Sequence, residues 1–197
     1  MSKGRLEAFS DGVIAILITI MVLELRPPAG SDFASLSDIV PNALAYLLSF
    51  VVLAIYWNNH HHLFAAVERI DGLVLWANMH LLFWLSLFPF ATAWVGEHPD
   101  GHVPVAAYGV ALLGAAVAYF ILTRALLRLH DQASNLAVAL GRDWKGKLSA
   151  GAYAAGIALS LVTTWLALII YTAVAIVWFV PDTRVHRVLT TSNDETG

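Results

Sequence analysis

The chain of 197 residues has no cysteine, which excludes both a disulfide framework and a thiolate metal site. Charged residues are scarce as well, at 13% against about 25% in an ordinary soluble domain. The few basic residues are not interleaved with aromatic ones, so a nucleic-acid-binding surface is not expected. The sequence also lacks the H-E-x-x-H zinc motif and the G-x-S-x-G nucleophile motif, so we expect neither an enzyme nor a cofactor.

Hydrophobic residues, by contrast, make up 59% of the chain, and the mean hydropathy is +0.71. These values predict an all-α integral membrane protein. The apolar run at residues 149–180 would be about 48 Å long as one helix, against a hydrocarbon core of about 30 Å, so we divide it near Thr163 and Thr164. Six membrane-spanning helices are then predicted, at about residues 6–26, 39–59, 70–95, 103–124, 148–162 and 165–181. They form one domain over residues 1–189, followed by a disordered polar tail at 190–197.

The distribution of lysine and arginine predicts how these spans are oriented. Basic residues gather before the first span, after the second and between the fourth and fifth: Lys3, Arg5, Arg69, Arg124, Arg128, Arg142, Lys145 and Lys147. The connection at residues 96–102 holds two acids and no lysine or arginine. Because cytoplasmic connections are enriched in lysine and arginine, both termini are predicted to be cytoplasmic, in the cell membrane. Dividing the apolar run at residues 149–180 into two spans also places Arg184 and Arg187 on the cytoplasmic side.

The first predicted helix has a narrow aliphatic face. On a wheel of about 100° per residue with Ile16 at zero, Gly12 and Ile20 lie at about 40° on either side, Leu23 at about 20° and Thr19 at about 60°. This first-helix stripe consists of Gly12, Ile16, Thr19, Ile20 and Leu23. Asp11 lies about 140° from Ile16 and Ser10 about 120° from it, so the acid faces neighbouring helices instead.

Asp11 needs partners, because an ionisable side chain at the start of a membrane span costs free energy unless it is paired. Polar residues at the end of the second span and in the third lie at the same depth. The candidate partners are His60, Trp76, Asn78 and His80. Amide, imidazole and indole N–H groups would satisfy a buried carboxylate, so we predict a polar network between the first three helices.

The opening segment reads R-x-x-x-F-S-D at Arg5, Phe9, Ser10 and Asp11, and it runs directly into G-V-I-A-I. This motif, at the start of a six-helix chain of this size, resembles the transmembrane protein 175 family of potassium channels. The resemblance implies a homotetramer in which the first helix of each subunit lines a central pore. It also implies that Ile16 forms the main constriction, with Ile20 and Leu23 as further rings.

Further site residues follow from the same resemblance. Thr19 lies beside the constriction and would offer a ring of hydroxyl groups, so K⁺ would pass transiently near Ile16 and Thr19. The motif residues would belong to a network between helices with the four candidate partners. The chain contains no T-V-G-Y-G segment, so a filter of stacked backbone carbonyls is excluded and a hydrophobic gate that dewets remains. Besides K⁺, the expected partners are membrane lipid and further copies of the chain.

Each of these features also has a simpler structural interpretation. The first-helix stripe is what helix packing or lipid contact requires as well, and Asp11 is a common type of helix N-cap. Three adjacent histidines at residues 60–62 point about 100° apart, so they cannot bind one metal ion together. The alternative function is a proton- or cation-coupled secondary transporter that uses Asp11 and His80 as carriers. No span carries an arginine-rich repeat, so steep voltage sensing is not expected.

Overall fold

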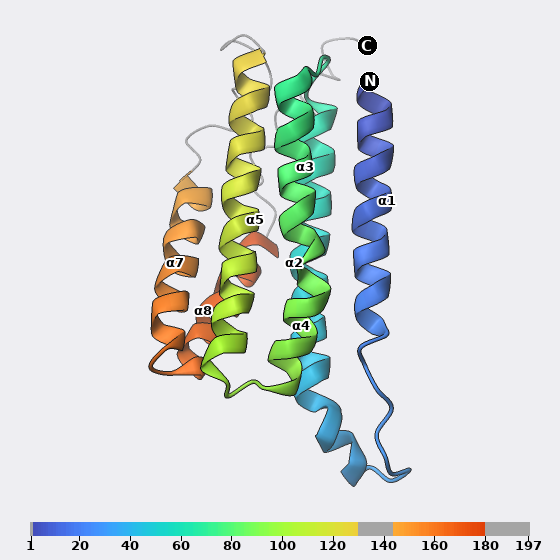
Figure 1. Ribbon diagram of the computed structural model, residues 1–197, viewed down its shortest axis with the longest axis vertical. Coiled ribbons are helices and arrows are strands. Elements are labelled where there is room, and N and C mark those ends of the chain that lie inside the picture. Colours follow the sequence, from blue (N-terminus) through green and yellow to red (C-terminus); the bar gives the residue numbers. More distant parts are fainter. Residues whose placement is uncertain (1, 130–143, 180–197) are drawn as a thin grey trace, which may run out of the picture.

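The computed structural model describes residues 2–129 and 144–179, and every regular element in these two ranges is a helix (Figure 1). The all-α prediction is therefore confirmed. The elements are α1 (Lys3–Val22), η1 (Ala34–Ile39), α2 (Val40–Ala65), α3 (Gly72–Ser86), α4 (Phe88–Glu97), α5 (His102–Leu129), α7 (Trp144–Ser160) and α8 (Thr164–Phe179). The predicted tail and the basic residues Arg142, Arg184 and Arg187 lie outside the described residues.

The helices stand side by side (Figure 1). Helix α4 continues in the direction of α3, whereas the other consecutive α-helices reverse direction. The first helix, α1, packs against α2, α3 and α4 at one side of the bundle, whereas α7 and α8 pack with α5 at the other. Three segments in the described part of the chain are long and apolar enough to cross a membrane: Ala34–Ala65, Gly72–Glu97 and His102–Leu129. Thr164–Phe179 is a shorter apolar helix. The chain is therefore a multi-pass membrane protein.

Prolines change two of the predicted boundaries. The first helix ends at Val22 rather than near residue 26, because Pro27 and Pro28 follow and disfavour helical backbone just before them. The third predicted span is two helices, α3 and α4, which meet at Leu87. Pro89, in the first turn of α4, has no N–H to donate to the carbonyl four residues earlier, so the helix breaks there.

The second helix is longer than predicted. It continues to Ala65, so the polar run at residues 58–62 lies within the helix and does not close it. The apolar pattern marks only the part of a helix that lipid surrounds. Backbone hydrogen bonds continue beyond that part, and the Ala66 N–H still donates to the His62 carbonyl at 3.3 Å.

Glycines let one aromatic ring fill the centre of the α5, α7 and α8 group. The ring of Tyr171 on α8 is fully buried. A Cβ atom at Gly109 on α5 would overlap the Tyr171 hydroxyl, and one at Gly156 on α7 would overlap the edge of the ring. The Tyr171 hydroxyl donates to the Val105 carbonyl of α5 at 3.5 Å. The three helices therefore approach closely only because both positions lack a side chain.

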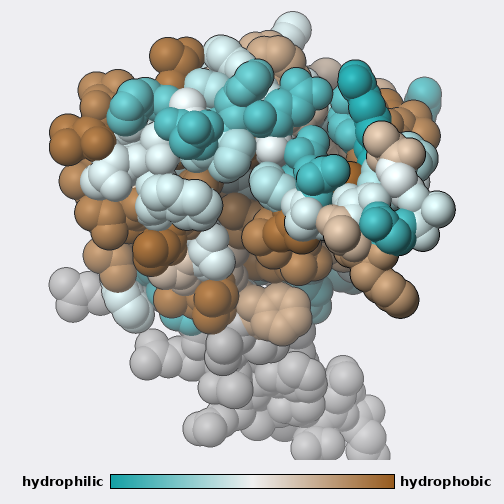
Figure 2. Space-filling model, turned by 90° about the horizontal axis from the view of Figure 1, so that it is seen from below, coloured by the Kyte–Doolittle hydropathy of each residue, from teal (hydrophilic) through white to brown (hydrophobic). Residues whose placement is uncertain are grey.

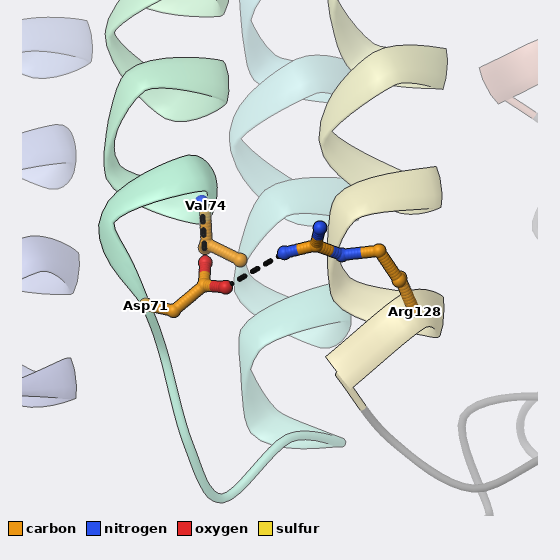
Figure 3. A network of polar contacts seen from close by, with 3 residues as sticks. All are labelled: Asp71, Val74 and Arg128. Atoms are coloured by element: carbon orange, nitrogen blue, oxygen red, sulfur yellow. Dashed lines mark hydrogen bonds and ion pairs between the residues drawn. The ribbon is translucent and has the colours of Figure 1, made fainter.

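An ion pair joins the start of α3 to the end of α5. Asp71 is the N-cap of α3 and accepts from the Val74 N–H at 2.9 Å through one carboxylate oxygen. Its other oxygen accepts from the Arg128 guanidinium at 2.9 Å (Figure 3). The Val74 N–H and, after it, the Arg128 charge hold the pKa of Asp71 below its usual value, so the ion pair persists at neutral pH.

We predict that Gly156→Ala destabilises the protein, because its methyl group would displace the buried Tyr171 ring. The expected loss in the free energy of unfolding is about 1–3 kcal/mol. The measurement is unfolding of the purified protein in mixed detergent and SDS micelles. Gly151→Ala is the matched control, since a Cβ atom at Gly151 on the same helix meets nothing within 4 Å. Equal losses for the two variants would contradict the packing role of Gly156.

Candidate functional site

The first helix has one face that packs against the bundle. Its buried residues are spaced three or four apart, as one side of a helix requires. They are Leu6, Ser10, Ile14, Leu17 and Met21. The side chains of this face contact α2, α3 and α4, which fixes the rotation of α1 about its own axis.

The first-helix stripe lies on the opposite face and is exposed. The exposed fractions are 56% for Ile16, 41% for Ile20 and 75% for Leu23. Leu23 is the C-cap residue and keeps helical backbone angles, so it continues the stripe past the end of α1. A Cβ atom at Gly12 would meet nothing within 4 Å. This face of α1 is thus not covered by any other part of the described chain.

Thr19 is the polar member of the stripe and is also exposed. Its hydroxyl donates to the backbone, with Oγ1 2.9 Å from the Ile16 carbonyl oxygen and 3.1 Å from that of Ala15. Because the hydrogen is committed to the helix, the oxygen lone pairs remain available on the exposed side. An oxygen in this state is suited to a cation rather than an anion.

Three buried side chains form a polar core between α1, α2 and α3. Asn78 on α3 donates from Nδ2 to Ser10 Oγ at 2.9 Å, and Ser10 donates to the Leu6 carbonyl at 2.9 Å. The Oδ1 atom of Asn78 lies 2.8 Å from Nε2 of His60 on α2. Since Oδ1 can only accept, His60 is the donor in this pair. The polar core, Ser10, His60 and Asn78, is fully buried with each of its members bonded.

Asp11 is attached to α2 by a different residue. Its Oδ1 atom accepts from the indole N–H of Trp57 at 3.0 Å, and the Trp57 ring stacks on His61 with 6.1 Å between centroids. The place of Trp57 near a predicted span end indicates only membrane anchoring. The signal that points to its further role is its spacing of three residues from His60, which puts both side chains on neighbouring positions of one helix.

Two expected partners of Asp11 lie on the exposed side of α3, away from the polar core. Trp76 is 77% exposed, and His80 is also exposed and accepts from the Trp84 indole N–H at 2.9 Å. Each is two residues from Asn78, which is about 200° on a helix, so burial of Asn78 turns both outward. The structure therefore does not bring Trp76 or His80 to Asp11.

The remaining motif residues have no part in the polar core. Arg5 and Phe9 are both exposed on α1, although Ser10, which directly follows Phe9, is buried. In the part of the chain that the structure describes, no group of three or more His, Cys, Asp or Glu side chains could hold a metal ion. The candidate site is thus the exposed aliphatic face of α1 with one hydroxyl group, and buried hydrogen bonds hold this helix in position.

An open hollow of about 410 Å³ lies beside the far end of α1, just after Leu23. Its lining comes from α4 and from the residue that follows Leu23: Glu24, Phe90, Ala93, Trp94 and Glu97. Both charged residues are acids, so the hollow is negative. Figure 2 looks onto this end of the bundle. Hydrophilic residues cover much of this end surface, and hydrophobic residues lie along the margin of the surface.

Comparison with known proteins gives consistent matches. The family model described as endosomal/lysosomal potassium channel TMEM175 matches residues 5–89. The chain is 50% identical over 189 residues to a potassium channel of Chryseobacterium sp. (strain P1-3), covering 96% of this chain and 98% of the relative. A human protein named endosomal/lysosomal proton channel TMEM175 is 38% identical over 81 residues, which cover 35% of this chain and 16% of that protein.

A solved structure is similar over most of the fold. It is the crystal structure of a lysosomal potassium-selective channel TMEM175 homolog from Chamaesiphon minutus, and the TM-score is 0.74 at 30% sequence identity. The likeness covers 89% of this chain and 95% of that one. It therefore extends well beyond the first three helices that the family model matches.

We predict that Asn78→Ala destabilises the fold by about 2–4 kcal/mol, because it leaves both Ser10 and His60 buried with a lost partner. The measurement is the free energy of unfolding in micelles, together with the elution volume in size-exclusion chromatography. Met79→Ala is the matched control, since Met79 is the next residue on α3 and is exposed. A loss no larger than that of the control would show that the polar core does not hold α1.

Proposed function

Because the chain belongs to the TMEM175 family of potassium channels, we propose that it conducts K⁺ passively through a central pore lined by α1 from several copies. The observation that carries this proposal is the first-helix stripe, which is aliphatic, exposed and uncovered within the described chain. Packing within one subunit does not explain why this aliphatic face is exposed, whereas a pore axis on that side of α1 does. Family resemblance supplies the subunit number, four.

In such a pore the side chains of Ile16 would form the tightest ring, with Ile20 and Leu23 as rings toward the end of α1. Rings of branched aliphatic side chains expel water when they close, and the absence of water blocks a hydrated ion. Conduction therefore requires the Ile16 ring to widen. The Thr19 oxygens, one turn from Ile16, would replace part of the hydration shell of K⁺ as it passes.

The polar core would set which face of α1 meets the pore. Ser10 lies about 120° from Ile16 around the helix, so anchoring Ser10 to Asn78 directs Ile16 away from the bundle. The bond from Trp57 to Asp11 adds a second attachment near the same depth. Both attachments lie in the first half of α1. The second half, with the aliphatic rings, is held mainly by apolar contacts, with one long bond of 3.8 Å from the Thr92 hydroxyl to the Met21 sulfur.

We place the protein in the cell membrane with six crossings and both termini in the cytoplasm. The support is the distribution of basic residues, since Arg69, Arg124 and Arg128 lie at the end of the bundle where α1 begins. The acidic hollow beside Leu23 is then at the external mouth. A negative cleft at a pore entrance raises the local concentration of cations.

The transporter hypothesis, in which Asp11 and His80 carry protons or cations, is weaker. Asp11 bonds to α2 through Trp57, whereas His80 bonds to Trp84 on its own helix. These bonds lead to different neighbours, so they do not link the two side chains in a relay. An electrical recording separates the hypotheses, because a carrier gives small coupled fluxes and a channel gives discrete single-channel currents.

The proposal is tested by single-channel recording of the purified protein in planar bilayers under bi-ionic K⁺ and Na⁺ gradients. We expect discrete currents that favour K⁺. Saturable flux coupled to protons, without unitary events, would replace the channel by the transporter.

We predict that Ile16→Asn raises the open probability or the unitary current and lowers the K⁺ over Na⁺ permeability ratio, because a ring of amides removes the dewetting barrier. Val22→Asn is the matched control. Val22 is exposed on the same helix but lies about 120° from Ile16, off the stripe. If Val22→Asn changed permeation and Ile16→Asn did not, the pore would have to lie on another face of α1.

We predict that Glu24→Gln lowers K⁺ current entering from the hollow side at low salt, by about two-fold at about 10 mM K⁺, where the Debye length is about 30 Å. At about 1 M K⁺ the screening length is about 3 Å and the currents of variant and wild type should agree. Current in the opposite direction through the same channels is the internal control. A reduction that did not depend on salt would assign Glu24 a structural role instead.

A further inference from the structure

The helix α5 exposes one narrow apolar stripe along its length. The members lie within about 40° of Val117 on a helical wheel. This α5 stripe consists of Val103, Val110, Val117 and Ile121, all exposed. From the first to the last it rises about 27 Å at 1.5 Å per residue, which is close to the thickness of a hydrocarbon core, about 30 Å.

The stripe ends in two arginines on the same side of the helix. Arg124 and Arg128 both lie within about 20° of Val117 on the wheel, and both are exposed. The opposite end of the stripe has no arginine or lysine, since the connection before α5 contains Asp100 and neither of these residues. The α5 surface is thus apolar for one membrane thickness and positive at one end only.

The two arginines are held in place by neighbouring side chains. The Arg124 guanidinium carbon lies 5.0 Å from the centroid of the Phe120 ring, one turn earlier on α5, and no carboxylate in the described ranges pairs with it. Arg128 is fixed by Asp71, yet its side chain is still 62% exposed (Figure 3). A planar guanidinium has five N–H donors, so Arg128 retains donors beyond the bond to Asp71.

We propose that this surface binds one anionic phospholipid, with its phosphate on Arg124 and Arg128 and an acyl chain along the α5 stripe. Arginine forks match phosphate oxygens in two parallel hydrogen bonds, and clusters of basic residues at the cytoplasmic interface attract anionic headgroups. Free phosphate would contact the two arginines only, because it has no apolar group to place on the α5 stripe. An acyl chain crosses only its own half of the hydrocarbon core, about 15 Å, so it would cover the half of the α5 stripe nearest the arginines. This apolar contact is what selects a lipid over free phosphate.

The position of this surface on the outside of the assembly rests on the proposed central pore. In that arrangement α1 faces the axis, and Figure 1 shows α5 and α7 on the far side of the bundle from α1. Lipid binding is measured without ion flow, however. A wild type that binds lipid but passes no current would end the channel proposal and leave the lipid site standing.

The experiment is native mass spectrometry of the purified full-length protein, titrated with phosphatidylglycerol or with phosphatidylcholine carrying the same acyl chains. We expect the wild type to retain phosphatidylglycerol preferentially. Arg124→Ala should weaken retention of that lipid by about three- to ten-fold and leave phosphatidylcholine unchanged. Arg124→Lys, which keeps the charge but loses the fork, should be intermediate.

Arg26→Ala is the matched control, because Arg26 is an exposed arginine at the opposite end of the bundle, and it should bind lipid as the wild type does. Size-exclusion chromatography checks that each variant is folded. The proposal is overturned if Arg124→Ala retains phosphatidylglycerol as well as the wild type, or if the wild type shows no preference. It is also overturned if soluble glycerol phosphate displaces the lipid at equal concentration, since the site would then recognise phosphate alone.

Discussion

The hydrogen bond from Asn78 to Ser10 is the constraint on which the rest of the site depends. It is the polar contact that ties α1 to α3 in the interior, and it exists because His60 occupies the other end of the same amide. A buried amide with an unfilled donor or acceptor costs free energy, so its two partners fix its orientation. The helix carrying Ser10 is thereby rotated so that its aliphatic residues face away. The exposed aliphatic face of α1 is a consequence of the face that is buried.

The sequence is sufficient to predict the rotation of α1 and insufficient to predict its partners. Helical periodicity separates Ile16 from Ser10 without any knowledge of neighbouring helices, and the observed burial agrees with that separation. Periodicity also places Trp76 and His80 opposite Asn78 on α3, but only the structure shows that Asn78 is the residue that turns inward. The role of Trp57 depends on how α1 and α2 are placed side by side, which periodicity within a single helix does not give.

The close packing of the peripheral helices is not predictable from the sequence either, for a different reason. Gly109 and Gly156 lie on separate helices, and both contact Tyr171, which a third helix inserts between them. No local pattern predicts an encounter of three segments. The break before α4, by contrast, follows from Pro89 alone, because the missing N–H is a local property. A property such as a missing N–H can be predicted from one segment of the sequence. Packing among several segments can be predicted only when their arrangement in space is known.

The two sides of the bundle are therefore stabilised in different ways, and the difference suits a channel. The α5, α7 and α8 side is fixed by a ring that fills space left by two glycines, an arrangement with little freedom because interiors are close-packed. The α1 side is fixed at its first half by hydrogen bonds to Ser10 and Asp11, and beyond them mainly by apolar side chains, which slide more easily than paired polar groups. The gate that we propose at Ile16 would lie just past these two polar attachments. Widening of that ring would then require only a tilt of the apolar half of α1, with the polar core as the pivot and the peripheral helices unchanged.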